Sequence, residues 1–220
     1  MTHRPGGPAD APGGAVDPRV EPVVRAQGTG LVAALTFDDG PNGADTARLL
    51  DLLRDTGIRA VFAVIGENVR APGGAELLRR TVAEGHVLCN HSTSFADLGD
   101  WPADRVADDL RATLRTIRDA LGDPTAPVPY WRAPNGSWGL TPQVAVELGM
   151  QPLGVVNVIQ DWVDQDVDVL ADRLRAAIRP GEVVLAHDGG GDRSGTVAAV
   201  ERVVRERLAA GWTFTLPQPR

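Results

Sequence analysis

The feature that most restricts the fold of this chain is a regular alternation of short apolar segments with longer amphipathic ones. The apolar segments are expected to form strands at residues 31–37, 60–65, 86–90, 130–133, 152–158, 182–187 and 213–216. The amphipathic segments are expected to form helices at residues 44–56, 75–84, 102–121, 141–148, 169–178 and 196–210. A strand followed by a helix over the whole chain predicts parallel strands with crossover helices, arranged as an open α/β sheet or as a barrel.

Length and composition indicate one domain behind a short lead-in. With 220 residues, of which 43% are hydrophobic, the chain is long enough to form a complete core over residues 26–220. Residues 1–25 are rich in Pro, Gly and Ala and contain no continuous apolar run. We therefore expect a disordered lead-in there, rather than a signal peptide or a membrane anchor.

Charge and cysteine content exclude several kinds of partner and site. The net charge of −7 argues against a nucleic-acid partner. No stretch approaches the roughly 20 apolar residues that a membrane span needs, so we expect a cytoplasmic protein without a membrane partner. The single cysteine, Cys89, excludes an internal disulfide and a zinc site built from several thiolates.

Polar side chains follow the expected strands at the edge of a parallel sheet where functional sites are found. They are Asp38 and Asp39 after the first strand, His91 after the third, Arg132 at the end of the fourth, Asp161 after the fifth, and His187 with Asp188 at the end of the sixth. Because the carboxyl ends of parallel strands meet at one edge, we expect these side chains to form one site.

The adjacent carboxylates of Asp38 and Asp39 indicate metal-assisted hydrolysis. Two like charges at the end of a buried strand repel each other and lose their water. One carboxylate can bind a hard or borderline cation while its neighbour accepts a proton. The alternative is a structural junction between strand and turn, in which the Asp side chains accept backbone donors ahead of Gly40 and Pro41.

Residues 130–138 include two tryptophans, a tyrosine, an asparagine and a glycine, which suit the wall of a sugar groove. The alternative for this segment is ordinary strand and turn packing. Within it, Arg132 can clamp a carboxylate, and Asp38 is the expected partner. Further along, Asp161 can hold the ring of His187 in one tautomer, the alternative being a surface carboxylate.

Five motifs in a fixed order give the chain its resemblance to a known family. They are residues 36–41, the segment at His91, residues 132–136, the pair Asp161-Trp162, and residues 185–188. Together they resemble the polysaccharide deacetylases of carbohydrate esterase family four, which include chitooligosaccharide and peptidoglycan deacetylases. The resemblance implies a distorted (β/α) barrel with about seven parallel strands.

The resemblance implies catalytic roles for four residues. Asp38 would be the base that activates the attacking water, and Arg132 would orient it through a charge-assisted pair. His187 would be the acid that protonates the leaving amine, with Asp161 steering its ring. These roles describe the hydrolysis of an amide bond other than a peptide bond.

The resemblance also implies a divalent metal, zinc above all, with Asp39 and His91 as ligands. The family's second motif has a further histidine ligand four residues after the first, where this chain has Phe95. A phenyl ring cannot coordinate a metal, so two protein ligands are expected where hydrolytic zinc sites normally have three. We expect weak metal binding, completed by water or substrate, or by a substitute ligand such as Ser94 or Asp97.

The expected function is a deacetylase-type hydrolase with a divergent site, which removes an N-acetyl or related acyl group from an amino sugar or a small acylated metabolite. By resemblance, Leu185 would line the pocket for the acetyl methyl group. The other side chains expected to bind substrate are Tyr130, Trp131, Pro134, Asn135, Trp138 and Trp162. Two alternatives are a catalytically impaired homologue that binds carbohydrate or has a regulatory role, and a metal-independent acid–base enzyme on the same fold.

Overall fold

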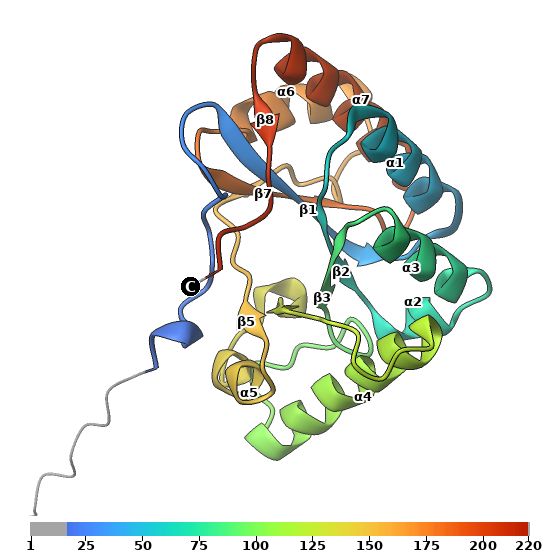
Figure 1. The fold of residues 1–220 in the computed structure, drawn as a ribbon, viewed down its shortest axis with the longest axis vertical. Helices are drawn as coiled ribbons and strands as arrows, with labels where there is room; N and C mark the ends of the chain where they lie inside the picture. Colours follow the sequence, from blue (N-terminus) through green and yellow to red (C-terminus); the bar gives the residue numbers. More distant parts are fainter. Residues whose placement is uncertain (1–16, 220) are drawn as a thin grey trace, which may run out of the picture.

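The structure, a computed structural model that describes residues 17–219, is a curled sheet of parallel strands with helices packed around it (Figure 1). The strands are β1 (Val32–Gly40), β2 (Val61–Val64), β3 (Val87–Asn90), β4 (Tyr130–Trp131), β5 (Gln151–Pro152), β6 (Asn157–Val158), β7 (Glu182–His187) and β8 (Thr213–Phe214). Their spatial order is β5-β4-β3-β2-β1-β7-β6, with β8 beside β1, and the pairings are all parallel. The expected distorted barrel of about seven parallel strands is confirmed.

The described helices lie around the outside of the curl (Figure 1). They are α1 (Gly43–Thr56), α2 (Gly66–Arg70), α3 (Gly74–Ala83), α4 (Ala103–Leu121), α5 (Thr141–Glu147), α6 (Val167–Ala177) and α7 (Ser194–Ala209), with short 3-10 helices at Pro18–Val20 and Pro134–Gly136. Helices α1 and α4 end at Gly57 and Gly122, each with a left-handed φ of +69° that glycine adopts without strain. Helix α2 was not expected, because five residues are too few to show a helical period. None of the described helices combines the length and apolar character needed to cross a bilayer.

The alternation of side chains along β1 determines where in the fold the site lies. Its odd positions, from Ala33 to Phe37, belong to the large core under the helices. Its first two even positions belong to a smaller apolar cluster on the opposite, concave face of the sheet. Thr36 and Asp38 continue that second face towards the carboxyl end, because successive side chains of a strand point to opposite sides. The interior of the curl is therefore apolar where β1 begins and polar where it ends.

The expected strand at 152–158 is instead two short strands, β5 and β6, at opposite edges of the sheet. Between them, Gly154 lies so close to Pro22 and Val24 that any side chain at this position would clash. Val23 is buried there, and its backbone exchanges hydrogen bonds of 2.8 Å with Pro152 and Gly154. The lead-in predicted for 1–25 falls outside the described residues up to residue 16, whereas residues 17–25 pack on the domain. The packed domain thus begins before residue 26.

His86 precedes β3 and is a structural residue of the core. Its Nδ1 accepts a hydrogen bond of 3.2 Å from the backbone N–H of Ala60, and its ring packs edge-on against Phe62. Its Nε2 is buried without a hydrogen-bond partner among the described residues. Burial lowers the pKa of His86 from 6.5 to about 4, so the folded protein keeps the ring neutral.

We predict that His86 makes the protein sensitive to mild acid and that His86→Phe removes this sensitivity. Because the folded pKa lies below the unfolded one, the unfolded chain takes up the proton first. The contribution of the neutral ring to stability is fully present above a pH of about 6.5. As the pH falls through about 4, the free energy of unfolding decreases by up to about 3 kcal/mol. Urea denaturation at neutral and mildly acidic pH measures this loss, and the same loss in the variant would contradict the prediction.

Candidate active site

The two carboxylates at the end of β1 reach the same site because the strand loses its alternation there. The pairing of β1 with β2 shifts register between Asp38 and Gly40, and Asp39 adopts a left-handed φ of +73°. In a regular strand two successive side chains would point to opposite faces, and an irregularity of this kind redirects one of them. His91 Nε2 accordingly lies 3.6 Å from Asp38 Oδ2 and 3.4 Å from Asp39 Oδ1.

Asp38 forms a buried ion pair with Arg132, as predicted from the sequence. The Nη1 of Arg132 donates to Asp38 Oδ1 at 2.6 Å and to Thr36 Oγ1 at 2.9 Å. Its Nε and Nη2 donate to the backbone carbonyls of Leu153 and Gly154. The side chains of Asp38 and Arg132 are 4% and 2% exposed, so water contributes little to either charge. The pair fixes the orientation of the Asp38 carboxylate.

The hydrogen bonding of His91 leaves a nitrogen lone pair directed at both carboxylates. Its Nδ1 lies 2.8 Å from the backbone carbonyl oxygen of Arg132, which can only accept, so we assign the proton of the neutral ring to Nδ1. Burial opposes the charge of Asp39, but His91, His187 and Arg193 outweigh it and lower the pKa of this carboxyl. Three groups rich in lone pairs thus face one another, an arrangement that suits a divalent cation.

The protein ligands for such a cation are few. Within residues 17–219, no group of three or more His, Cys, Asp or Glu side chains has the arrangement of a metal site. Phe95, in the position expected for a third ligand, is 43% exposed. Asp97, an expected substitute, is exposed and accepts a hydrogen bond of 2.9 Å from Asn135. Asp39 and His91 therefore fit a metal ion with a set of two protein donors.

The second imidazole lies beside the first strand because of the sheet register. His187 is the Cα partner of Asp38 in the parallel pairing of β7 with β1. Asp161 holds it at two points: Oδ1 lies 2.7 Å from His187 Nδ1, and Oδ2 accepts the His187 backbone N–H at 2.8 Å. Burial lowers the pKa of His187, but the hydrogen bond and charge of Asp161 and the charges of Asp38 and Asp39 outweigh it and raise that pKa above 6.5. The ring is thereby favoured as a charged proton donor.

Two residues predicted to line a sugar groove do not offer their side chains to a ligand. Tyr130 is buried, and its hydroxyl donates to the backbone carbonyl of Pro217 at 3.2 Å. Trp131 is fully buried in the large core under the helices. Both predictions were wrong because adjacent strand residues point to opposite faces of the sheet, and each face is packed at this level.

The other predicted substrate contacts range from buried to exposed. Trp162 is 52% exposed and packs edge-on against the ring of His187, with 5.4 Å between ring centroids. Leu185 is on β7, two residues before His187 and opposite Thr36 in the pairing with β1. The remaining three are Pro134, which is buried, Trp138, which is half-buried, and Asn135, which is exposed. Of these residues, Trp162 lies nearest to His187 through its ring contact, and Leu185 lies nearest in strand register.

Backbone strain is concentrated around the same residues. Four non-glycine residues of the described chain have a positive φ: Asp39, Ser92, Asn135 and Gln160. Ser92 follows His91, and Gln160 precedes Asp161. Such conformations cost on the order of 1–3 kcal/mol each and are retained mainly where a precise geometry is needed. The strain therefore supports the assignment of the site independently of its charges.

Two buried residues beside the site, Asp188 and Arg193, were given no role from the sequence, although Asp188 was expected at the end of the sixth strand with His187. Asp188 is fully buried, its Oδ2 accepts from Thr46 Oγ1 at 2.6 Å, and its Oδ1 has no partner among the described residues. Burial raises the pKa of Asp188 to about 7. Arg193 is buried in the glycine-rich turn ahead of α7. The position of Asp188 next to His187 was the only available indication, and Arg193 gave none.

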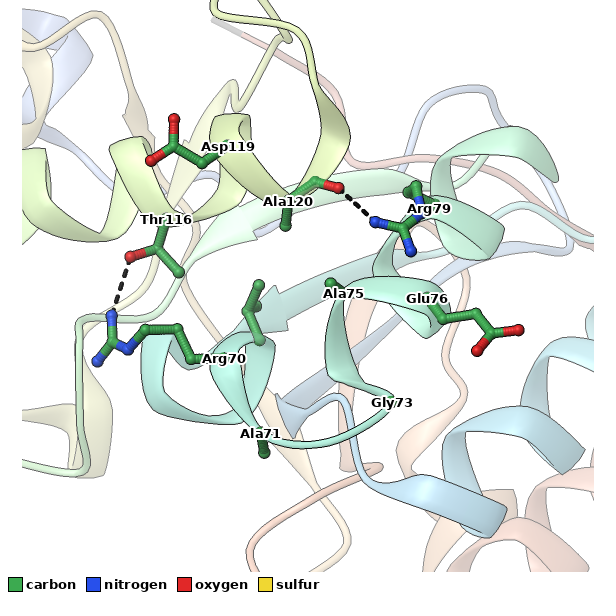
Figure 2. A pocket seen from close by; sticks show the side chains of 10 residues that line it. Arg70, Ala71, Gly73, Ala75, Glu76, Arg79, Thr116, Asp119 and Ala120 are labelled. Carbon is green, nitrogen blue, oxygen red and sulfur yellow. Dashed lines mark hydrogen bonds between the residues drawn. The ribbon is translucent and has the colours of Figure 1, made fainter.

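A surface hollow of about 650 Å³ lies away from these residues, between α2, α3 and the end of α4 (Figure 2). Arg70 and Arg79 line it together with Glu76 and Asp119, so its formal charges balance. It contains none of the residues that converge at the ends of β1 and β7. The hollow is therefore separate from the candidate active site.

The fold and the site together define the class of this protein. A carboxylate fixed by a buried arginine and an imidazole fixed by a second carboxylate lie on adjacent strands, next to Asp39 and His91. This combination is suited to metal-assisted hydrolysis of an acyl group, as in carbohydrate deacetylases.

Comparison with known proteins leads to the family. A sequence model of the polysaccharide deacetylase family matches residues 25–153. The chitooligosaccharide deacetylase of Bradyrhizobium sp. (strain ANU 289) is 40% identical over 189 residues, which cover 83% of this chain and 82% of that protein. The chain belongs to the polysaccharide deacetylase family, which places it among deacetylase-type hydrolases.

Solved structures agree with this fold. A family 4 acetyl xylan esterase from Clostridium thermocellum, in complex with a cobalt ion, has a TM-score of 0.74 and 27% identity, covering 84% of this chain and 87% of that one. A family 4 pseudoenzyme from Bacillus anthracis has a TM-score of 0.79 and 22% identity, covering 90% of this chain and 67% of that one. The second likeness shows the fold alone. Deacetylases of the family are generally metal-dependent.

We predict that Arg132→Met destabilises the protein by about 3–5 kcal/mol, because it leaves the buried Asp38 carboxylate without its cation. The double variant Arg132→Met with Asp38→Asn should regain part of this loss, since no uncompensated charge remains. Arg175→Met serves as the control: it breaks a more exposed pair with Glu206 and should cost about 1 kcal/mol or less. Urea denaturation measures all three, and equal losses in the two single variants would contradict the account.

Proposed function

We propose that this protein removes an N-acetyl group, or a related acyl group, from an amino sugar by metal-assisted hydrolysis. The observation that carries the proposal is the pairing of Asp38 with His187 on adjacent strands, each held by its own counter-charge. The similarity to a chitooligosaccharide deacetylase supports an N-acetylated sugar as the substrate class.

The residues of the chain account for both proton transfers. Asp38, oriented by Arg132, accepts a proton from a water molecule while the oxygen of that water attacks the acyl carbonyl carbon. His187, held by Asp161, gives its proton to the amide nitrogen as the carbon–nitrogen bond breaks. The products are a carboxylic acid, acetate in the simplest case, and a free amino sugar.

Asp39 and His91 would hold the divalent ion, and zinc suits their oxygen and nitrogen donors. When bound there, the ion would polarise the acyl carbonyl as a Lewis acid. Loss even of a residue that only supports a ligand commonly costs about 10–100-fold in affinity or activity. With Phe95 in place of a third ligand, we therefore propose that the ion is weakly held and exchanges readily.

The substrate is proposed to be small. Leu185, buried on β7, would contact the acyl methyl group, and Trp162, half-exposed beside His187, would cover the sugar or its acyl group. We propose a small acylated sugar or metabolite and a cytoplasmic site of action. Acetate release from N-acetylglucosamine, chitooligosaccharides and peptidoglycan fragments, compared under identical conditions, tests this preference, and a clear preference for peptidoglycan would contradict it.

Metal content and turnover measured on the same purified protein separate the proposed function from its alternatives. Acetate release that requires added zinc and stops with a chelator supports the proposal. Release that persists without metal indicates acid–base hydrolysis by Asp38 and His187 alone. Binding of sugars without acetate release at saturating zinc would indicate a catalytically impaired homologue and would overturn the proposal.

We predict that Asp38→Asn abolishes turnover and leaves the fold intact, because an amide cannot accept the proton of the attacking water. Acetate release and circular dichroism are the measurements. Asp108→Asn makes the same chemical change on an exposed part of α4 and should leave turnover unchanged. Undiminished activity of Asp38→Asn would remove the proposed base.

We also predict that Phe95→His raises zinc affinity by at least about 10-fold, because it supplies a third protein donor. Competition with a chromophoric chelator measures the dissociation constant. Phe95→Ala removes the ring without adding a donor and should bring no gain. An unchanged dissociation constant in Phe95→His would mean that residue 95 does not lie at the metal position.

A further inference from the structure

Arg193 is a buried cation whose guanidinium is not paired with a carboxylate of residues 17–219. It lies immediately before α7 with 6% of its surface exposed. Its guanidinium forms no ion pair among the residues that the structure describes. Its partners are instead four backbone carbonyl oxygens, and its own backbone N–H donates to Asp45 Oδ2 at 2.9 Å. A buried guanidinium satisfied by dipoles alone is an uncommon and costly arrangement.

The four carbonyls belong to two different loops. Three lie in the glycine-rich turn after β7: Nε donates to Gly189 at 2.7 Å, Nη2 to Gly190 at 3.0 Å, and Nη1 to Asp192 at 3.2 Å. The fourth is the carbonyl of Asp161, which accepts from Nη1 at 3.2 Å. One side chain thus joins the turn that follows His187 to the loop that carries the partner of the His187 ring.

The guanidinium of Arg193 also lies near the carboxylate of Asp39. A Cβ atom built on Gly190 would lie 2.6 Å from Asp39 Oδ2 and 3.4 Å from Arg193 Nη2, so a glycine without a side chain separates the two groups. Gly190 also has a φ of +75°, which favours glycine. The charge of Arg193 is one of the causes of the lowered pKa of Asp39. The turn therefore brings a fixed positive charge close to the Asp39 carboxylate. A residue larger than glycine at position 190 would not fit between the two groups.

We propose that Arg193 is a positioning residue of the reaction, which holds the backbone of Asp161 and the turn after His187 in the geometry that the acid requires. Asp161 orients His187 through two hydrogen bonds from its carboxylate, and Arg193 holds the backbone of Asp161 through a hydrogen bond to its carbonyl. Loss of the guanidinium releases the turn after His187 and removes one of the two donors to the Asp161 carbonyl, the other being Gln165 Nε2 at 2.6 Å, so that His187 no longer directs its proton accurately at the leaving nitrogen. This inference rests on the proposed function and names a residue that the function had not used.

The leaving group of the substrate tests this role. An amide needs a proton on its departing nitrogen, whereas an activated aryl acetate leaves as a stable anion and needs none. We expect Arg193→Met to lower kcat/KM by about 10–100-fold for an N-acetylated sugar and by no more than about threefold for the aryl ester. Arg193→Lys, which keeps the charge but has fewer donors, should fall between. Equal losses on both substrates would show a merely structural role and would overturn the proposal.

Two further variants complete the test. Arg207→Met changes an arginine within α7 that is half-buried and also bonded to a backbone carbonyl, but far from the site, and it should leave kcat/KM unchanged for both substrates. Combined with His187→Gln, Arg193→Met should add less than about threefold to the loss on the amide, because both changes disable the same acid. Independent, multiplying losses would contradict a role through His187.

A measurement without turnover distinguishes failure of this inference from failure of the proposed function. The Nδ1–H proton of His187, shared with Asp161, should give a low-field proton resonance that is assigned by its disappearance in His187→Gln. We expect Arg193→Met to broaden or abolish this resonance and Arg207→Met to preserve it. An unchanged resonance in Arg193→Met would overturn the positioning role, whether or not the protein hydrolyses any substrate.

Discussion

The parallel register between β1 and β7 is the constraint on which the whole site depends. It makes Asp38 and His187 direct neighbours on adjacent strands, although 149 positions separate them in the chain. A shift of one residue in either strand would turn one of the two side chains into the apolar core under the helices. The extensive apolar packing of both strands fixes this register, so the packing of the core determines how Asp38 and His187 lie relative to each other.

Two of the buried charges at the site are tolerated because each is paired with an opposite charge. Arg132 balances Asp38, and Asp161 balances a charged His187, with hydrogen bonds of 2.6 and 2.7 Å. Among the described residues, Asp39 has the imidazole of His91 alone within ion-pair distance, and the charges of His187 and Arg193 act on it from farther away. A neutral imidazole carries no charge of its own, so the Asp39 carboxylate can still share a divalent cation with His91, which is the electrostatic reason to propose the metal on this side of the site.

Much of this could be predicted from the sequence, because strand-ending polar residues are visible as such. The pairs Asp38–Arg132 and Asp161–His187 follow from residue type and position. Other features depend on which face of the sheet a side chain points to and on how it packs. A sequence motif specifies neither. Trp131 suggested a sugar-binding surface but lies in the core, since the pleat turns it towards the helices. Arg193 could not be foreseen, because its partners are backbone carbonyls that every residue possesses.

The central claim is that a metal ion sits between one carboxylate and one imidazole, with a phenylalanine where a third ligand would be. Anomalous diffraction at the zinc edge, from crystals soaked in saturating zinc, tests this directly. The account predicts one peak beside Asp39 and His91, while Asp38 remains bound to Arg132. No peak beside these two residues, or a peak held by His187 or Asp188 in their place, would contradict it.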